Sequence, residues 1–248
     1  MTSLEDDSIL TVGFVGAGGN GKTALVEVLL SGDTSPQSKN RKKHTFEEEH
    51  TAAGRQTYGI DMHDIRIDSI HSKKARAKLE ELSAEKSRAR RTLARKDVQL
   101  EDRQAHFRID DTSGQKELEP LTVQSLQSHD VTCIVVDCKM ANWKHHLDYW
   151  LGLAERTRRL VPEPSHGRRT KLPPRRIVIA FSKSDLIAKY AVMKSNVEEA
   201  EAYVKAKGLP CVRVSAKKRR NLDELVEILL DNTTVPTVER TAKCCALM

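Results

Sequence analysis

The sequence has few aromatic residues and no long apolar run. Phe, Tyr and Trp together make up 4% of its 248 residues, and no stretch of eighteen apolar residues occurs. A transmembrane helix needs about 20 such residues, so none is expected. Residues 1–7 are polar and acidic, without the basic start and apolar core of a signal peptide. We therefore expect a cytosolic chain.

Cysteine is also scarce, with five residues in the chain. Cys133, Cys138 and Cys211 lie in or beside apolar runs, and their spacings match no zinc motif. We interpret these three as buried thiols. Cys244 and Cys245 differ because they lie close to the C-terminus.

The net charge of +7 is concentrated in two segments. Residues 70–105 hold 11 Lys and Arg against 6 Asp and Glu, a net +5, and residues 156–176 hold 8 against 1, a net +7. The rest of the chain is therefore net negative by 5, since 7 − 5 − 7 = −5. The basicity therefore belongs to these two segments and not to the core of the chain, which matters for the partners that charge would attract.

Apolar runs alternate with helical patterns along the chain. We expect strands at 9–15, 58–68, 106–110, 131–137, 177–181 and 211–214, and helices at 22–30, 144–160, 197–207 and 222–230. Residues 32–56 are polar and predict a loop. This alternation predicts an α/β fold, with a six-stranded, mostly parallel sheet flanked by helices.

A phosphate-binding motif follows the first expected strand and opens the first expected helix. It has the pattern G-x-x-x-x-G-K-[ST] of a P-loop NTPase, whose glycines let backbone N–H groups surround a phosphate. The lysine of such a loop reaches the β- and γ-phosphates, and the hydroxyl after it binds Mg²⁺. The predicted phosphate and metal ligands come from Gly16, Gly18, Gly19, Asn20, Gly21, Lys22 and Thr23.

A second motif follows the strand expected at 106–110. The run from Asp111 to Gln115 reads D-T-S-G-Q and resembles the D-x-x-G-Q motif of Ras-superfamily small GTPases, as the phosphate loop also does. The resemblance implies that Asp111 holds Mg²⁺ through water, that the Gly114 N–H contacts the γ-phosphate and that Gln115 orients the attacking water. Gln115 and Lys22 are thus the predicted catalytic residues.

Two further motifs resemble the guanine-binding segments of the same family. The first, Ser182-Lys183-Ser184-Asp185, is similar to N-K-x-D, in which the Asp185 carboxylate accepts hydrogen bonds from guanine and the Lys183 stem covers the base. The second, Ser215-Ala216-Lys217, is similar to S-A-K, whose backbone meets guanine O6. Ser182 departs from the family Asn, so we expect weaker contacts to guanine and to the phosphate loop.

The threonine that senses the γ-phosphate and Mg²⁺ in small GTPases is assigned to Thr57. The segment that begins at Thr57, T-Y-G-I-D, resembles the Rab-like T-I-G-V-D segment that enters the second strand. Thr51 and Thr45 are alternatives, because the loop is longer than in typical Ras proteins.

The resemblance implies a Ras-like GTPase domain over residues 9–232, with GTP or GDP and Mg²⁺ as ligands. Two segments interrupt this domain: a basic, helix-forming insertion at 69–104 and a proline-rich loop at 161–174. Leu79, Leu82, Ala89, Leu93 and Leu100 give the insertion at most a weak coiled-coil pattern. Residues 233–248 are expected to be a flexible tail.

The tail ends in Cys245-Ala246-Leu247-Met248, which fits a C-a-a-X box and predicts a farnesyl group on Cys245. Cys244 is a candidate for palmitoylation, and two lipids anchor a protein where one binds only reversibly. We therefore expect the cytoplasmic face of a membrane, with the plasma membrane as one candidate.

Two interpretations of the basic insertion remain open. Its Lys and Arg can supplement the lipid on an anionic membrane surface, or it can be a solvated charged helix. Nucleic acid is not an expected partner, since no aromatic stacking platform accompanies the charge.

The sequence predicts a GTP/GDP switch that hydrolyses GTP slowly, because no arginine can be assigned as a catalytic finger. Its expected partners are effectors, exchange factors and GTPase-activating proteins. The alternative is a scaffold that binds nucleotide weakly or permanently and presents the insertion to a partner, as Ser182 and the long loop before Thr57 suggest. A P-loop ATPase is a third possibility, against which Asp185 argues.

Overall fold

A computed structural model describes residues 10–31, 59–66, 73–93, 106–157 and 176–231. Its six strands are β1 (Leu10–Val15), β2 (Ile60–Arg66), β3 (His106–Thr112), β4 (Val131–Asp137), β5 (Arg176–Ser182) and β6 (Cys211–Arg213). Its α-helices are α1 (Lys22–Leu30), α3 (Lys73–Leu93), α4 (Glu119–Leu126), α5 (Trp143–Arg156), α6 (Ala191–Ala206) and α7 (Leu222–Leu230). Short 3-10 turns, η2 (Lys116–Leu118) and η3 (Ser184–Lys189), follow β3 and β5.

The strands form one sheet in the order β2-β3-β1-β4-β5-β6. Strand β2 is antiparallel to β3, and the other neighbours are parallel. Strands β1, β4 and β5 lie in the interior of the sheet and are almost wholly buried, as their continuous apolar runs predict. The expected α/β fold with a six-stranded, mostly parallel sheet is therefore confirmed.

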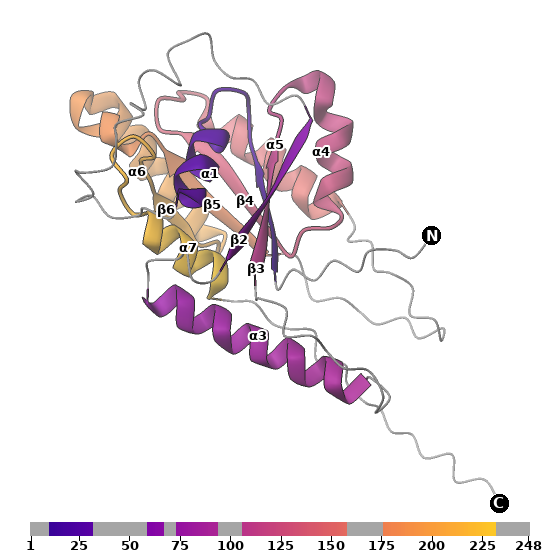
Figure 1. The fold of residues 1–248 in the computed structure, drawn as a ribbon. Coiled ribbons are helices and arrows are strands. Elements are labelled where there is room, and N and C mark those ends of the chain that lie inside the picture. The colour runs from indigo at the N-terminus through magenta and orange to yellow at the C-terminus, as the bar shows by residue number, and fades with distance from the viewer. Residues whose placement is uncertain (1–9, 32–58, 67–72, 94–105, 158–175, 232–248) are drawn as a thin grey trace, which may run out of the picture.

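Helices cover both faces of the sheet, giving three layers (Figure 1). One core lies between the sheet and helices α1, α3 and α7. The other lies between the sheet and helices α4, α5 and α6. Cys133 and Cys138 are buried in these cores, as expected, whereas Cys211 is half-buried. Among the described residues, no helix combines the length and the apolar composition needed to cross a bilayer.

Several expected boundaries and one missing helix need correction. The largest shift is in α6, which begins at Ala191, six residues before the start expected at residue 197. Strand β3 continues to Thr112, so Asp111 lies within the strand rather than after it. Helix α5 ends at Arg156, four residues before the expected end. Helix α4 was not predicted: its eight residues have Pro120 in the first turn and little apolar periodicity.

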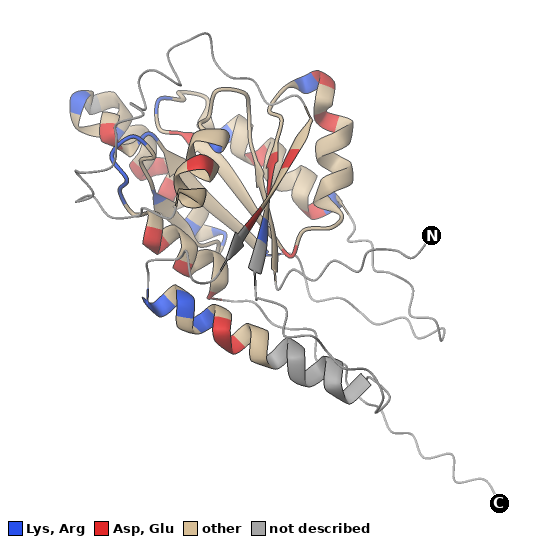
Figure 2. Ribbon diagram, viewed as in Figure 1, with Lys and Arg blue, Asp and Glu red and all other residues tan. Residues whose placement is uncertain are grey.

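The inserted helix α3 is docked on the domain through its first half. Ala75, Leu79 and Leu82 are at most 3% exposed and belong to the core that α7 completes. Lys74 Nζ donates to Glu227 on α7 at 2.9 Å. The first half of α3 is therefore not a wholly solvated helix, and Leu79 and Leu82 pack against the domain rather than in a coiled coil. Figures 1 and 2 show this helix lying beneath α7, with Lys and Arg in its first turns.

Candidate nucleotide-binding site

The phosphate loop connects β1 to α1 as the motif predicts. Gly16 has φ +145°, and a Cβ atom there would lie 2.4 Å from the carbonyl oxygen of Val135. Gly21 caps α1 with φ +84°, a left-handed conformation that side chains disfavour. Both glycines are thus required by the path of the loop, which leaves the N-terminus of α1 facing the ligand position.

Lys22 is buried at the base of this loop. Its Nζ donates to the carbonyls of Gly16 at 2.9 Å and Ala17 at 3.1 Å. Burial lowers the pKa of Lys22 to about 8, and the nearby Asp111 carboxylate partly opposes that shift. A bound phosphate would restore the stability of the ammonium form, because an opposite charge favours the charged state.

The D-x-x-G-Q segment lies directly against the phosphate loop. The Gly18 N–H donates to the Gly114 carbonyl at 3.0 Å. A Cβ atom on Gly114 would lie 2.4 Å from Gly18 N and 2.6 Å from Lys22 Nζ. Two motifs nearly 100 residues apart in the sequence are therefore in contact, as the resemblance implies.

Ser113 connects this segment to its neighbours. Its N–H donates to the Gly59 carbonyl, just before β2, at 2.9 Å. Its carbonyl accepts from Thr122 Oγ1 on α4 at 3.3 Å, and its own hydroxyl accepts from the Gln115 N–H at 3.2 Å. These hydrogen bonds would therefore transmit a displacement of Gly114 to Gln115, to α4 and to the start of β2.

The residues present fit a Mg²⁺ ion. Asp111 is 1% exposed near Lys22, and Thr23 follows Lys22 in the first turn of α1, which packs near β3. No group of three or more His, Cys, Asp or Glu side chains in the described part of the chain is arranged to hold a metal. One carboxylate and one hydroxyl suit Mg²⁺, which keeps waters and takes its remaining ligands from phosphates.

A cavity of about 530 Å³ lies beside the loop, at the ends of β5 and β6. Asp185, on η3, is held there by the Ser215 hydroxyl, which donates to its Oδ1 at 2.5 Å. Lys183 Nζ donates to the Gly19 carbonyl at 2.6 Å and to Asp137 Oδ2 at 2.7 Å, so it joins the cavity to the phosphate loop. The other lining residues include Gly21, Ala24, Leu25, Ser182, Leu186, Lys189, Ala216, Lys217 and Lys218.

Ser182, which stands in place of the family Asn, does contact the phosphate loop. Its hydroxyl donates to the Asn20 carbonyl at 2.6 Å and lies 3.3 Å from the Val136 carbonyl. Asn20 adds a second hydrogen bond, since its Nδ2 donates to the Val135 carbonyl at 2.8 Å. Serine and asparagine together hold the loop to the ends of β4 and β5.

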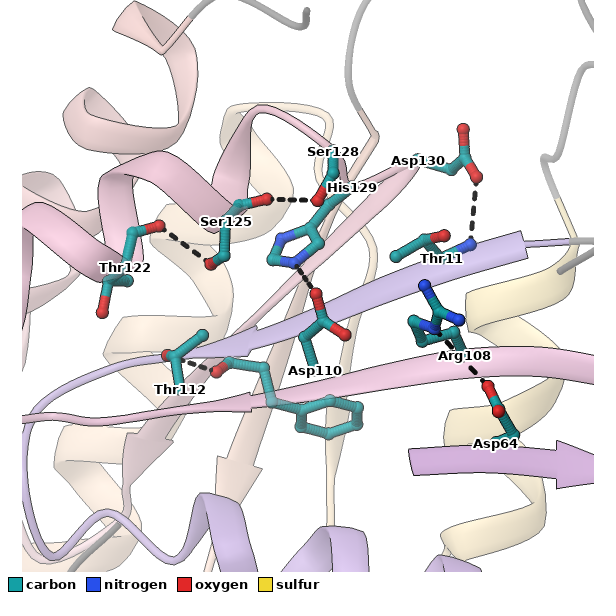
Figure 3. Close-up of polar contacts among 11 residues, drawn as sticks. Thr11, Asp64, Arg108, Asp110, Thr112, Thr122, Ser125, Ser128, His129 and Asp130 are labelled. Carbon is teal, nitrogen blue, oxygen red and sulfur yellow. Dashed lines mark hydrogen bonds and ion pairs between the residues drawn. The ribbon is translucent and has the colours of Figure 1, made fainter. Parts of the chain in front are cut away.

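A buried polar pair that the sequence did not reveal lies on the α4 face of the sheet (Figure 3). His129 Nε2 and Asp110 Oδ2 are 2.9 Å apart, and their side chains are 0% and 6% exposed. A Cβ atom on Gly13 would lie 1.9 Å from the His129 ring, so the ring packs directly on β1. Asp110 precedes Asp111 in β3, and His129 follows α4, so the pair closes the segment that carries Gly114 and Gln115.

Several predicted site residues lie outside the described part of the chain. These are Thr57 with its alternatives Thr45 and Thr51, and the tail cysteines Cys244 and Cys245. Their assignments stay predictions. The proline-rich loop at 161–174 also lies outside the described residues.

These features define a P-loop GTP-binding domain: a phosphate loop between a strand and a helix, a D-x-x-G segment in contact with it, and a cavity lined in part by Asp185. The family model of the elongation factor Tu GTP binding domain matches residues 7–235 of the chain. The chain belongs to this family. No curated protein matches the chain significantly. The match supports a GTP-binding domain, and not specifically a Ras- or Rab-like small GTPase.

Proposed function

We propose that the protein is a GTP/GDP switch of the small-GTPase type that hydrolyses GTP slowly with Mg²⁺. The observation that carries the proposal is the hydrogen bond between Gly18 and Gly114. Gly114 rests against Lys22 Nζ, which is where a terminal phosphate would be held. A third phosphate must therefore push Gly114 off the loop, and Ser113 passes that movement to Gln115 and to the start of β2.

The residues would act as follows. Lys22 and the loop N–H groups would bind the phosphates, Thr23 and Asp111 would hold Mg²⁺, and Asp185 would select guanine. The ion would neutralise charge on the phosphates during transfer. Gln115 would orient the attacking water. Effectors, exchange factors and activating proteins would read or change the state of these segments.

The first experiment identifies the nucleotide that copurifies with the protein and follows GTP hydrolysis in single-turnover assays with Mg²⁺. We expect GDP, and slow hydrolysis that Gln115→Leu lowers by about 100-fold or more, as loss of a positioned catalytic group does. Lys116→Leu, at the exposed neighbouring position, is the matched control and should retain the wild-type rate. Hydrolysis unaffected by Gln115→Leu would favour the scaffold, and a site filled with ATP would favour an ATPase.

We further propose that the protein is anchored to an anionic membrane through its tail and α3. The tail follows α7, and Lys74 at the start of α3 bonds to Glu227 on that helix. The basic insertion therefore begins next to the helix from which the lipidation motif departs. Each added cation near an anionic surface contributes about 1 kcal/mol.

Two measurements test the anchor separately. Farnesyltransferase should modify the protein but not Cys245→Ser, as intact mass shows. Unlipidated protein should bind vesicles of 30 mol% phosphatidylserine more tightly than a Lys86, Arg88, Arg90 and Arg91→Gln variant. The matched control replaces Arg158, Arg159, Arg168 and Arg169 by Gln, which removes the same charge from the other basic segment. Equal loss in both variants would contradict a specific role for the insertion.

A further inference from the structure

Guanine offers different groups on its two polar edges. Its N1–H and amino group are donors, and an Asp carboxylate can accept both. Its O6 and N7 are acceptors and need protein donors. Which edges a site reads is therefore decided by the donors and acceptors that face the base cavity.

Ser182 ends β5 and lines the base cavity, but its only hydrogen is used elsewhere. A hydroxyl has a single O–H donor. In Ser182 that donor is directed to the Asn20 carbonyl at 2.6 Å, with the Val136 carbonyl at 3.3 Å as its second neighbour. The residue is 2% exposed, so the hydroxyl is fixed in a protein-facing position. Toward the cavity it has only lone pairs, which cannot bond to N7.

The adjacent donor is also engaged. Lys183 Nζ lies between the Gly19 carbonyl at 2.6 Å and Asp137 Oδ2 at 2.7 Å, and both contacts draw it toward the phosphate loop. Asp185, in contrast, is held in place by Ser215 with carboxylate oxygen facing the cavity. At the end of β5 the donors of Ser182 and Lys183 are thus both engaged by the protein, whereas Asp185 offers an acceptor to the donor edge of guanine. The other cationic side chains that line the cavity, Lys189, Lys217 and Lys218, come from η3 and from the loop after β6.

We infer that this protein selects guanine without reading N7, and that Ser182 is the residue that sets this property. Guanine nucleotides in which N7 is replaced by C–H, or otherwise lacks acceptor character, would be full ligands. The inference rests on the guanine-nucleotide binding of the proposed function and specifies which part of the base that site recognises.

Titration calorimetry with GDP and 7-deaza-GDP on the nucleotide-free full-length chain tests it. One neutral hydrogen bond changes a binding constant by about two- to twelvefold. We expect wild-type Kd values for the two nucleotides to agree within about twofold. A larger penalty for 7-deaza-GDP would overturn the inference. Failure of GDP itself to bind would contradict the proposed function. This outcome differs from failure of the inference, in which GDP binds and 7-deaza-GDP binds more weakly.

Two variants locate the effect. Ser182→Asn introduces amide N–H donors at the same position, so 7-deaza-GDP should become about two- to twelvefold weaker than GDP. Ser182→Ala removes the tie to Asn20, so both nucleotides should bind more weakly while their ratio stays near one. A ratio that rises in Ser182→Ala would mean that the serine hydroxyl contributes to N7 recognition, and would overturn the assignment. The ratio is internal to each variant, so a general loss of affinity does not obscure it.

Discussion

The backbone N–H of Gly18 donates a hydrogen bond to the backbone carbonyl of Gly114 at 3.0 Å. The contact joins the phosphate loop to the segment that carries Gln115. It is possible only because residue 114 has no side chain: a Cβ atom would lie 2.4 Å from Gly18 N and 2.5 Å from the carbonyl carbon of Ala17. Both neighbours are backbone atoms that cannot rotate away.

Replacing Gly114 by Ala should therefore destabilise the nucleotide-free protein by about 1–3 kcal/mol, the usual cost of overpacking. Urea denaturation in EDTA measures this change. Gly152→Ala is the matched control, because Gly152 lies in α5 and its Cβ would meet only the end of the Arg156 side chain at 3.9 Å. Alanine there should be neutral or stabilising by up to about 1 kcal/mol. Equal effects of the two substitutions would show that the contact is not maintained in solution.

The lowered pKa of Lys22 gives the affinity for GDP a pH dependence. Burial places this pKa at about 8 when no phosphate is bound, and bound phosphates would raise it. Binding above pH 8 then requires uptake of a proton, so affinity should fall there by up to about tenfold per pH unit and change little below. Calorimetry at pH 7.0 to 9.5 measures this, and Lys22→Gln should bind weakly with no such slope. A steep slope in that variant would assign the effect to another group.

The same shift acts on stability in the opposite direction. Without nucleotide, the folded protein releases the Lys22 proton near pH 8, whereas the unfolded chain retains it to its ordinary pKa of 10.5. Between these values the unfolded state holds more protons, so the contribution of Lys22 to the free energy of unfolding rises with pH. The cost of burying its charge is present in full below pH 8. Lys22→Gln should abolish this part of the pH dependence of urea denaturation.

The buried pair of His129 and Asp110 should contribute far more to stability than an exposed pair nearby. Within the described structure, His129 Nδ1 and Asp110 Oδ1 have no hydrogen-bond partner, so each residue depends on the other. His129→Ala would leave a buried carboxylate unpaired and should lower the free energy of unfolding by about 2–5 kcal/mol. Arg108→Ala breaks an exposed pair with Asp64 across β2 and β3 and should cost less than about 1 kcal/mol. If urea denaturation gave similar decreases in the free energy of unfolding for both variants, burial would not be what makes the pair of His129 and Asp110 important for stability.

Much of the fold and the ligand contacts could be predicted because their signals are local. The bounds of α1, β4 and α7 agree with the apolar runs residue for residue. The phosphate loop and Asp185 lie where their motifs place them, because the carboxyl ends of parallel strands meet at one edge of the sheet. The contact between Gly18 and Gly114 follows from the order β3-β1 in that sheet.

The parts that could not be predicted depend on pairs of residues that no local pattern connects. Asp110 lies in β3 and His129 in the loop between α4 and β4, and the two fit no motif. Ser182 and Asn20 lie 162 positions apart, so no local pattern shows that the serine hydroxyl donates to the loop carbonyl. Helix α4 lacks the periodicity that marks α7, whose apolar face is pronounced.

The docking of α3 on the domain yields a prediction about the inserted segment. Leu79 is fully buried between α3 and the core that α7 completes, whereas its neighbour Glu80 is exposed. Leu79→Ala should lower the free energy of unfolding by about 2–5 kcal/mol, as truncation of a buried leucine does. Glu80→Ala should change it by no more than about 0.5 kcal/mol. Urea denaturation of both variants, with the free energy extrapolated to water, provides the comparison.

Nucleotide exchange in the same two variants extends this test from stability to function. Helix α3 lies between β2 and β3 in the chain, and β3 carries Asp111. If docking restrains these strands, Leu79→Ala should release GDP faster than wild type at a temperature where both are folded, while Glu80→Ala should not. Unchanged stability in Leu79→Ala would show that α3 is an appendage in solution. Lower stability with unchanged GDP release would show that α3 is docked but does not restrain the nucleotide site.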